Sequence, residues 1–334
     1  MHIKFKWLAI FEFTVILFLL AVLLFHKSSS VTGNAQQQAQ QNNTGLLSAR
    51  VYAGILQPKS LLIVNFEPLR EKLHEYITNR NLSISVYVVN LRDGADMGIN
   101  ENKGFPPASL NKIPVAILIL KKIEKGELSF NTMLDIKDSD RSDAFGTLYR
   151  TKEKKLQVRA LFEYMLNESD DTAFYVLKNQ IDQNDLKFLL SYLDYHSKNM
   201  ILPKDANYDY AKLEYVTPNS IYNVFSSLYF STLLKANDSE YILSLLTNTV
   251  FDIRKIAGLP DDVRIAQKFG AEYAGNTKYF HSCGIMYIQS SRIFYCIMTE
   301  NLEQKDAVAA FNYVVDLTYK YVVDIRKELE EYKG

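Results

Sequence analysis

A serine and a lysine whose spacing would suit a nucleophile and its base lie at the start of an apolar segment. Ser109 and Lys112 are three residues apart in PPASLNKIPVAIL, and residues with this spacing share one face of a helical turn. Burial lowers the pKa of a lysine, so a neutral Lys112 could take the proton of Ser109, while the helix N-terminus favours negative charge developing on a substrate. The same pattern also fits an ordinary helix in which Ser109 is only the N-cap residue.

Two further groups of polar residues follow downstream. Ser169 and Asp171 lie in LNESDDTAFYVL, and Lys268, Phe269 and Gly270 lie in RIAQKFGAEYAG. Taken singly, Ser169 fits a helix N-cap and Lys268 fits a solvated charge on a strand. It is the order of the three groups along the chain that makes them informative.

Together these groups resemble the S-x-x-K, S-D-N and K-T-G elements of class A β-lactamases and penicillin-binding proteins. The segment SVYVVNLRDGADMGINENKGFPPASLNKIPVAIL resembles the first hairpin and nucleophile helix of that superfamily. AGLPDDVRIAQKFG and HSCGIMYI resemble the approach to the third element and the strand after it. The resemblance extends from about Ile55 to Asp324, and it implies a serine hydrolase that acts on a β-lactam or a peptidoglycan-type peptide.

The resemblance also implies a role for each matched residue. Ser109 would attack the acyl carbonyl, and Lys112 would be its base. Ser169 would relay protons between Lys112 and the leaving nitrogen. Lys268 would attract the substrate carboxylate as a point charge. The backbone N–H groups of Ser109 and Ala271 would form the oxyanion hole.

Two departures from the superfamily pattern fall in the expected substrate-binding set. Asp171 stands where the superfamily has Asn, and its charge favours the protonated form of Lys112, which weakens that base. Phe269 replaces a Thr whose hydroxyl would help to hold the substrate carboxylate, so recognition would depend on Lys268 and on apolar contact. The expected set consists of Asp171, Lys268, Phe269 and Gly270.

A third departure concerns hydrolysis of the acyl-enzyme. Class A enzymes use a glutamate from a loop about seventeen residues before a Thr-Pro pair, which here resembles Thr217 and Pro218. Around that distance the chain reads KNMILPKDAN, and the loop acids Asp205, Asp209 and Glu214 lie off the expected spacing. We therefore expect a persistent acyl-enzyme. The alternatives are a catalytically impaired binding or sensor module for cell-wall peptides or β-lactams, and a purely structural domain.

The elements that must position these residues follow from apolar periodicity. It predicts helices at 66–78, 113–124, 156–166, 172–180, 219–234 and 304–332. Runs of β-branched and aromatic residues predict strands at 83–90, 97–99, 264–269, 284–288 and 292–299. Strands at both ends around a helix-rich middle indicate one α+β domain with a single sheet. The resemblance implies a β-lactamase/transpeptidase-like fold, with about five antiparallel strands flanked by helices and a helical subdomain.

The segment at 113–124 is apolar all round as far as residue 120, which predicts burial on all sides.

An N-terminal membrane anchor is expected. Residues 7–25 (WLAIFEFTVILFLLAVLLF) contain one charged residue, Glu12, and approach the ~20 residues of a spanning helix. Lys4 and Lys6 precede this stretch and Lys27 alone follows closely, so the N-terminus is expected in the cytoplasm and the rest outside it. A cleaved signal peptide is the alternative.

The chain is accordingly divided into three parts. We expect a transmembrane anchor at 1–27, a polar tether rich in Gln, Asn and Ser at 28–54, and a serine hydrolase domain at 55–334. The protein would then be a single-pass membrane protein with its catalytic domain outside the cytoplasm.

Composition limits the remaining partners and cofactors. Lys and Arg number 38, as do Asp and Glu, so no net charge would attract nucleic acid. The five histidines show no paired ligand spacing, and no metal or other cofactor is expected. Cys283 and Cys296 flank an expected turn at 289–292, and counting outward from it makes them diagonal neighbours. A disulfide is left open but is not favoured over two buried thiols.

Overall fold

The computed structural model describes Leu46 and residues 64–195, 199–202, 215–274, 276–289 and 291–331. The chain divides into two compact units, Met1–Gln57 and Pro58–Gly334, and the helices and strands below belong to the second. The predicted anchor at 1–27, and the predicted tether at 28–54 apart from Leu46, lie outside the described residues. None of the described helices combines the length and the apolar character that crossing a membrane would require.

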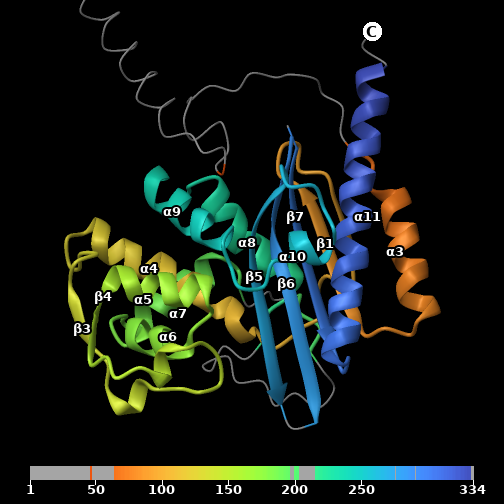
Figure 1. Ribbon diagram of the computed structural model, residues 1–334. Helices are drawn as coiled ribbons and strands as arrows, with labels where there is room; N and C mark the ends of the chain where they lie inside the picture. Colours follow the sequence, from red (N-terminus) through yellow and green to blue (C-terminus); the bar gives the residue numbers. More distant parts are fainter. Residues whose placement is uncertain are drawn as a thin grey trace, which may run out of the picture. The chain divides into compact units, whose positions relative to one another are not determined.

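A sheet of five antiparallel strands, in the order β2-β1-β7-β6-β5, runs through this unit (Figure 1). The strands are β1 (Ile84–Asn90), β2 (Asp96–Ile99), β5 (Arg264–Ala274), β6 (Thr277–Ile288) and β7 (Ser291–Glu300). Strand β1, from the start of the domain, pairs with β7 from its end, with Val88 opposite Tyr295. The prediction of an α+β fold in which strands from both ends of the domain meet in one sheet is therefore confirmed.

Strands β5 and β6 are longer than predicted. Their ladder runs without a break from the pair Arg264–Tyr287 to the pair Ala274–Thr277. The apolar pattern is interrupted at Gly270 and in the polar stretch near the turn, but backbone pairing continues across both. The extended part of β5 begins at Gly270, which lies next to Ala108 and Pro107.

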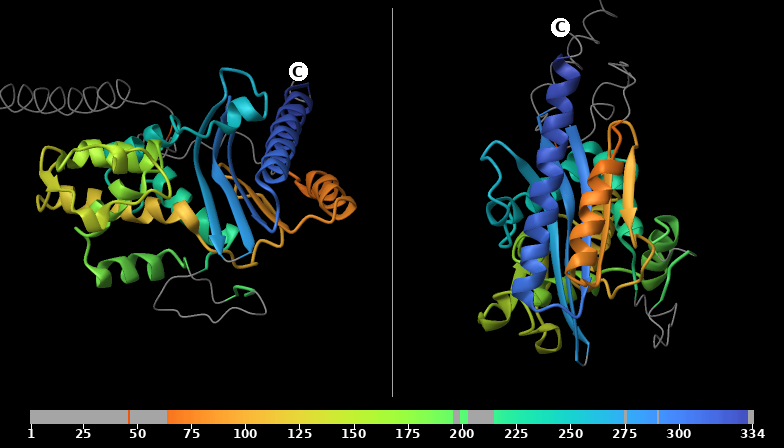
Figure 2. Two further views of the ribbon diagram at one scale, coloured as in Figure 1. Left: turned by 60° about the horizontal axis from the view of Figure 1, so that its bottom comes forward. Right: turned by 90° about the vertical axis from the view of Figure 1, so that its right-hand side faces the viewer.

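Helices α3 (Glu67–Asn79) and α11 (Gln304–Glu331) cover one face of the sheet. Helix α11 packs against β6, β7 and α3, and the two helices lie side by side in Figure 2. Leu69, Leu73 and Ile77 of α3 are buried at the helical spacing that the sequence shows. They join one core with strand residues and with the apolar side chains of α11.

A group of helices lies on the other side of the sheet and forms the predicted helical subdomain (Figure 2). It contains α4 (Lys112–Glu124), α5 (Val158–Asn167), α6 (Asp171–Lys178), α7 (Gln183–Tyr192), α8 (Pro218–Tyr229) and α9 (Ala236–Leu246). Helix α8 packs against β1, β6 and β7, and α9 packs against β5. The structure adds elements that were not predicted, namely α7, α9, the short α10 (Ile253–Ile256) and the ribbon of β3 (Met133–Asp135) with β4 (Lys155–Gln157).

Helix α4 is the central helix of this group. It contacts α5, α6 and α7, and from Lys112 to Leu120 every residue except Leu118 is buried. The prediction of burial on all sides is confirmed. Lys112 is the first residue of this helix, and its side chain is buried together with those that follow it.

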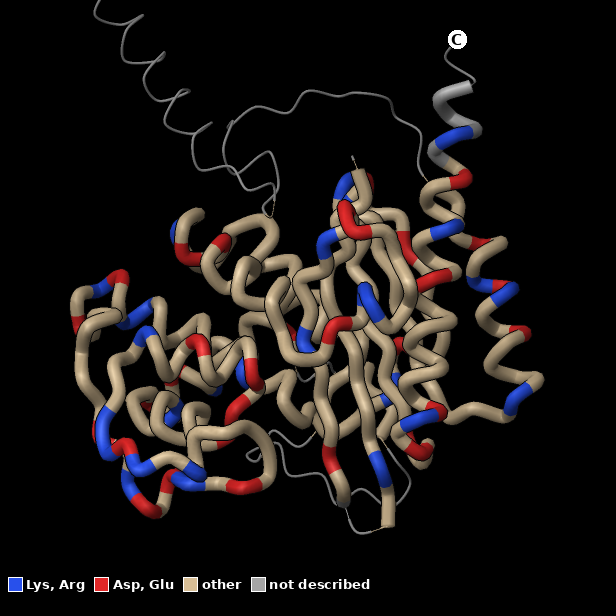
Figure 3. Tube along the Cα trace, viewed as in Figure 1, with Lys and Arg blue, Asp and Glu red and all other residues tan. Residues whose placement is uncertain are grey.

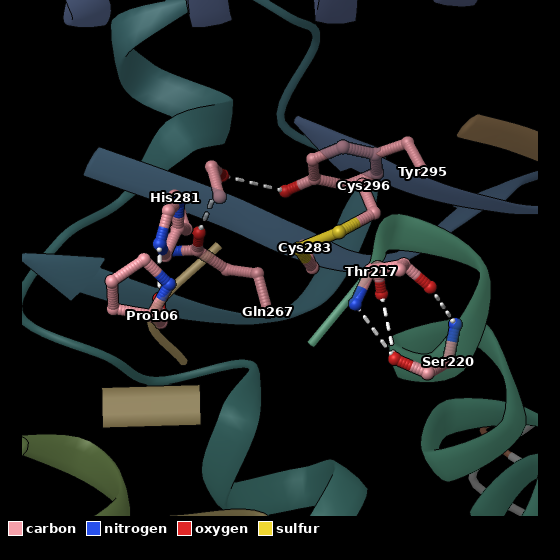
Figure 4. Close-up of a disulfide and its surroundings, with 9 residues drawn as sticks. Pro106, Thr217, Ser220, Gln267, His281, Cys283, Tyr295 and Cys296 are labelled. Carbon is pink, nitrogen blue, oxygen red and sulfur yellow. Dashed lines mark hydrogen bonds between the residues drawn. A yellow bond between two sulfur atoms is a disulfide. The ribbon is translucent and has the colours of Figure 1, made fainter. Parts of the chain in front are cut away.

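Cys283 and Cys296 form a disulfide between β6 and β7, with their Cα atoms 3.9 Å apart (Figure 4). The prediction that these cysteines are diagonal neighbours, with a disulfide not favoured, is wrong. Ile288 already pairs with Ser291, so the turn is two residues long rather than the four expected at 289–292. The shorter turn shifts the register and places the two cysteines directly opposite each other.

Basic and acidic residues are interspersed along the described trace (Figure 3). Many of the ion pairs are local, such as Lys320 with Asp316 four residues earlier in α11, at 2.7 Å. Within the described ranges, no group of three or more His, Cys, Asp or Glu side chains is placed to hold a metal ion.

Candidate active site

The candidate nucleophile lies in a short 3-10 turn, Ala108–Asn111, that runs directly into α4. Neither the turn nor α4 begins with a side-chain cap, so the alternative that Ser109 is only an N-cap residue is wrong. The preceding residue, Ala108, has a φ of 48°. A left-handed alanine costs about 1 to 3 kcal/mol and persists only where its surroundings impose it. The backbone around Ser109 is therefore held by contacts from elsewhere in the fold.

The Nζ of Lys112 lies among four acceptors. It is 2.8 Å from the Oγ of Ser109, 2.8 Å from the carbonyl oxygen of Ser169, 3.3 Å from the Oγ of Ser169 and 2.5 Å from the Oδ1 of Asp171. An ammonium group has three protons, so it cannot satisfy all four at once. Burial lowers the pKa of Lys112 below its ordinary value, and the nearby Asp171 acts in the opposite direction.

Ser169 lies in the loop between α5 and α6, with a φ of 58°. The cap of α6 is Asp170, whose Oδ1 accepts the N–H of Ala173 at 2.8 Å, so the alternative that Ser169 is the cap is wrong. The other oxygen of Asp170 accepts the N–H groups of Thr147 and Leu148 at 2.7 and 2.8 Å. This buried carboxylate joins two loops and thereby fixes the backbone of Ser169.

Lys268, on β5, reaches the same serine from the sheet. Its Nζ is 2.6 Å from the Oγ of Ser169 and 3.2 Å from the carbonyl oxygen of Phe269. The residue is 2% exposed, so the alternative of a solvated strand charge is wrong. Burial lowers the pKa of Lys268 well below its ordinary value, and the charge of Lys112 lowers it further. The hydroxyl of Ser169 thus links two buried lysine amines.

Gly270 allows β5 to approach the nucleophile turn closely. A Cβ at this position would lie 3.2 Å from the Cβ of Ala108 and 3.5 Å from the carbonyl oxygen of Pro107. Ala271 follows on β5, which is the edge strand of the sheet and packs against the turn. An edge strand has backbone groups that no neighbouring strand takes up. This location is compatible with the predicted use of the Ala271 N–H in an oxyanion hole.

The two residues that depart from the superfamily pattern have different surroundings. Asp171 is the first residue of α6 and belongs to the hydrogen-bond network of Lys112. The ring of Phe269 stacks on Phe251 with centroids 4.3 Å apart and is near Phe280 at 6.5 Å. The structure thus joins Ser109, Lys112, Ser169, Asp171 and Lys268 in one network, while Phe269 packs among aromatic side chains.

Two residues that were not predicted support the backbone before Ser109. The carboxylate of Glu272 interacts with the backbone N–H of Ala108, and burial raises the pKa of Glu272 while this interaction opposes the rise. The Nε2 of the buried His281 is 2.8 Å from the carbonyl oxygen of Pro106 (Figure 4). Burial lowers the pKa of His281 to about 4, so the ring is neutral near pH 7 and its Nε2–H donates to that carbonyl.

The loop that would supply a deacylating base is described at residues 199–202. Met200 lies about seventeen residues before Thr217, and a Cβ at Gly104 would be 2.9 Å from the Met200 sulfur. Thr217 and Ser220 cap α8 reciprocally, each side chain accepting the backbone N–H of the other (Figure 4). The loop acids that the sequence singled out lie outside the described residues: Asp205, Asp209 and Glu214.

Known proteins resemble this chain in sequence and in fold. The family model described as "Beta-lactamase enzyme family" matches residues 68–322. The chain is 25% identical over 219 residues to beta-lactamase VEB-1 of Pseudomonas aeruginosa, covering 61% of this chain and 72% of that protein. A beta-lactamase from Chitinophaga pinensis superposes with a TM-score of 0.66 at 17% identity, covering 77% of this chain and all of that one. An acyl-enzyme complex of a PBP-A mutant with penicillin G superposes with a TM-score of 0.66 at 18% identity, covering 77% of this chain and 97% of that one.

Proposed function

Since this chain belongs to the beta-lactamase enzyme family, we propose that it forms an acyl-enzyme through Ser109. The acyl donor is a β-lactam or a peptidoglycan-type peptide, and the acyl-enzyme is hydrolysed slowly. The observation that carries this proposal is the 2.8 Å hydrogen bond between the Nζ of Lys112 and the Oγ of Ser109. The base lies within reach of the proton that it must remove.

Acylation begins when the neutral amine of Lys112 accepts the hydroxyl proton of Ser109. The Oγ forms a bond to the acyl carbon, and the π electrons of the carbonyl move to its oxygen. The N–H groups of Ser109 and Ala271 stabilise this oxyanion. The C–N bond then breaks, the nitrogen takes the proton that Lys112 passes through the hydroxyl of Ser169, and the acyl group remains as an ester. Lys268 orients that hydroxyl, because its amine is 2.6 Å from the same oxygen.

Hydrolysis of the ester requires a base beside an attacking water. At the spacing where class A enzymes have a glutamate, this chain has Met200, whose side chain cannot accept a proton. We infer that the ester is long-lived. This behaviour fits a penicillin-binding protein better than an efficient β-lactamase.

We also propose that residues 1–27 anchor the protein in the cell membrane and that residues 28–54 tether the domain on its outer side. The support is the apolar run at 7–25 with lysines before it. Cell-wall peptides and β-lactams are accessible to a domain on that side of the membrane.

Intact-mass measurement after exposure to benzylpenicillin tests the proposal. We expect the full-length protein to gain the mass of one penicillin, and Ser109→Ala to gain none. The melting temperature of the variant should stay close to that of the wild type, since it loses one hydrogen bond worth about 1 kcal/mol. Labelling of Ser109→Ala would remove Ser109 from the mechanism.

A catalytically impaired binding or sensor module is the second candidate. The observation that favours it is the ion pair between Lys112 and Asp171, with Nζ and Oδ1 2.5 Å apart. A carboxylate this close favours the protonated lysine, which is no base. If benzylpenicillin raises the melting temperature without any change in mass, the protein binds the drug and does not react with it.

A further inference from the structure

The charged side chains at the candidate active site differ in how far they reach solvent. Lys112 and Lys268 are each 2% exposed, so their amines are enclosed by protein. The side chain of Asp171 is 21% exposed although it is bonded to the buried Lys112. Of these three ionisable groups, the carboxylate is the most accessible to solvent.

Asp171 is held in a fixed position beside the nucleophile. Its N–H donates to the carbonyl oxygen of Phe145 at 3.0 Å, and its Oδ1 accepts from Lys112 at 2.5 Å. Its second oxygen, Oδ2, accepts no hydrogen bond from any side chain or backbone group in the described part of the chain. Because Lys112 also bonds to Ser109, this carboxylate is two hydrogen bonds from the attacking oxygen. A group that binds Oδ2 is therefore linked to Ser109 through the amine of a single lysine.

A carboxylate only accepts hydrogen bonds, so it discriminates between donors and acceptors on a substrate. A substrate carbonyl at Oδ2 would be repelled, whereas an ammonium group would gain a charge-assisted hydrogen bond. We propose that Asp171 selects acyl donors that carry an ammonium group near the scissile carbonyl, such as amino-substituted β-lactams or peptides with a free amino group. This inference rests on the proposed acyl-enzyme chemistry of Ser109.

The substrate ammonium also acts on the base. A positive charge near a lysine disfavours its protonated form, and it competes with Lys112 for the negative charge of Asp171. A cationic acyl donor therefore increases the fraction of neutral Lys112 at the time when Ser109 must lose its proton. The selectivity consequently appears in the rate of acylation as well as in binding.

Two penicillins that differ by one amino group provide the test. Benzylpenicillin and ampicillin share the lactam and the carboxylate, but ampicillin carries an α-amino group on its side chain. Acylation rate constants for both are measured by intact mass on the full-length protein and on Asp171→Asn, which keeps the shape and removes the charge. The quantity compared is the ratio of the ampicillin constant to the benzylpenicillin constant, so that any general loss of activity in the variant cancels.

We expect this ratio to be roughly threefold to tenfold higher in the wild type than in Asp171→Asn, the range of a partly exposed charge interaction. In the wild type it should also fall when salt rises from about 0.05 M to about 0.5 M, because salt screens exposed charges. Equal ratios in the two proteins, or a wild-type ratio that salt does not change, overturn the selectivity and leave the acyl-enzyme proposal in place. If neither penicillin forms an adduct, the acyl-enzyme proposal fails, and the selectivity fails with it.

Discussion

At the scale of single residues, a serine hydroxyl at this site lies between two buried amines. The Oγ of Ser169 is 2.6 Å from the Nζ of Lys268 and 3.3 Å from that of Lys112. Two ammonium groups at this separation would repel each other in surroundings that already disfavour charge. Burial lowers the pKa of both lysines, and Lys112 lowers that of Lys268 further. Protonating these lysines in the folded protein therefore costs free energy, and the free energy of unfolding should depend on pH.

We expect Lys268→Met to raise the free energy of unfolding near neutral pH. The pKa of Lys268 is well below its ordinary 10.5 in the folded protein, so between these two values the unfolded chain binds a proton that the folded chain lacks. Wild-type stability consequently rises with pH across this window. Methionine removes that dependence, so the gain should shrink as pH increases towards 10.5. The lost hydrogen bond to Ser169 offsets about 1 kcal/mol of the gain at every pH.

Urea unfolding of Lys268→Met and wild type at about pH 6.5 and about pH 9.5 measures this difference. Lys320→Met is the matched control, because Lys320 is exposed in α11 and, within the described residues, its ion pair is with Asp316 four positions earlier. A gain for Lys268→Met that is the same at both pH values would show that burial does not lower its pKa.

The order of the motifs along the chain predicted most residues of the candidate site, but not the two residues that support the backbone before Ser109. Ser109, Lys112, Ser169 and Lys268 could be predicted because superfamily elements occur in a fixed order along a chain. Glu272 and His281 could not, because their partners are the backbone N–H of Ala108 and the carbonyl of Pro106, more than a hundred residues away. The sequence signal that could have found Glu272 is its position two residues after Gly270. It was overlooked because the strand was predicted to end before it.

At the scale of elements, strand β5 both carries Lys268 and restrains the turn that carries Ser109. We expect Glu272→Ala to lower the acylation rate constant about fivefold, equivalent to roughly 1 kcal/mol, which is the typical net value of one hydrogen bond. Without the carboxylate, the N–H of Ala108 loses its partner, and the left-handed backbone before Ser109 can relax. The next N–H, that of Ser109, would then lose the orientation that the proposed oxyanion hole needs.

Glu272→Gln separates positioning from proton transfer, since its amide oxygen can still accept the N–H of Ala108 but cannot act as a base. We expect the Gln variant to acylate within about twofold of the wild type, with the same dependence of rate on pH. If Gln and Ala slow acylation equally, the charge of Glu272 rather than its hydrogen bond is what matters.

Helices and strands with a strong apolar pattern could be predicted from the sequence. The register of strand pairing and the helices with a weak apolar pattern could not. The first strand, the buried helix α4 and the long α11 were predicted within a few residues of their observed bounds. The disulfide was missed because a turn two residues shorter than expected realigns Cys283 with Cys296. Helix α7 was missed because QNDLKFLLSY buries only Leu186, Leu189 and Leu190, too short a pattern to stand out.

At the scale of the whole molecule, the hydrolase domain should fold without the N-terminal segment. Every described helix and strand lies at or after Glu67, in the unit that begins at Pro58. We expect a chain lacking residues 1 to 50 to be soluble and to keep the near-UV circular dichroism of the full-length protein. The same mass gain with benzylpenicillin would show that its site is intact. An insoluble product, or a flat near-UV spectrum, would place the domain boundary earlier in the chain.

The proposed catalytic cycle is a property of the whole molecule, because in it acylation and hydrolysis would use residues from different parts of the fold. Acylation needs the network around Ser109, whereas hydrolysis needs a base positioned beside a water, which typically contributes about 10² to 10⁴ in rate. Met200 supplies no such base, and the nearby Asp171 favours the protonated, inactive form of Lys112. We therefore expect a chromogenic cephalosporin to give a burst of at most about one equivalent followed by very slow turnover. Steady turnover at roughly tens per second would reveal a deacylating base elsewhere, since rates of that order are those of ordinary efficient enzymes. Glu214→Gln is then the first variant to measure, because loss of turnover with the burst retained would identify Glu214 as that base.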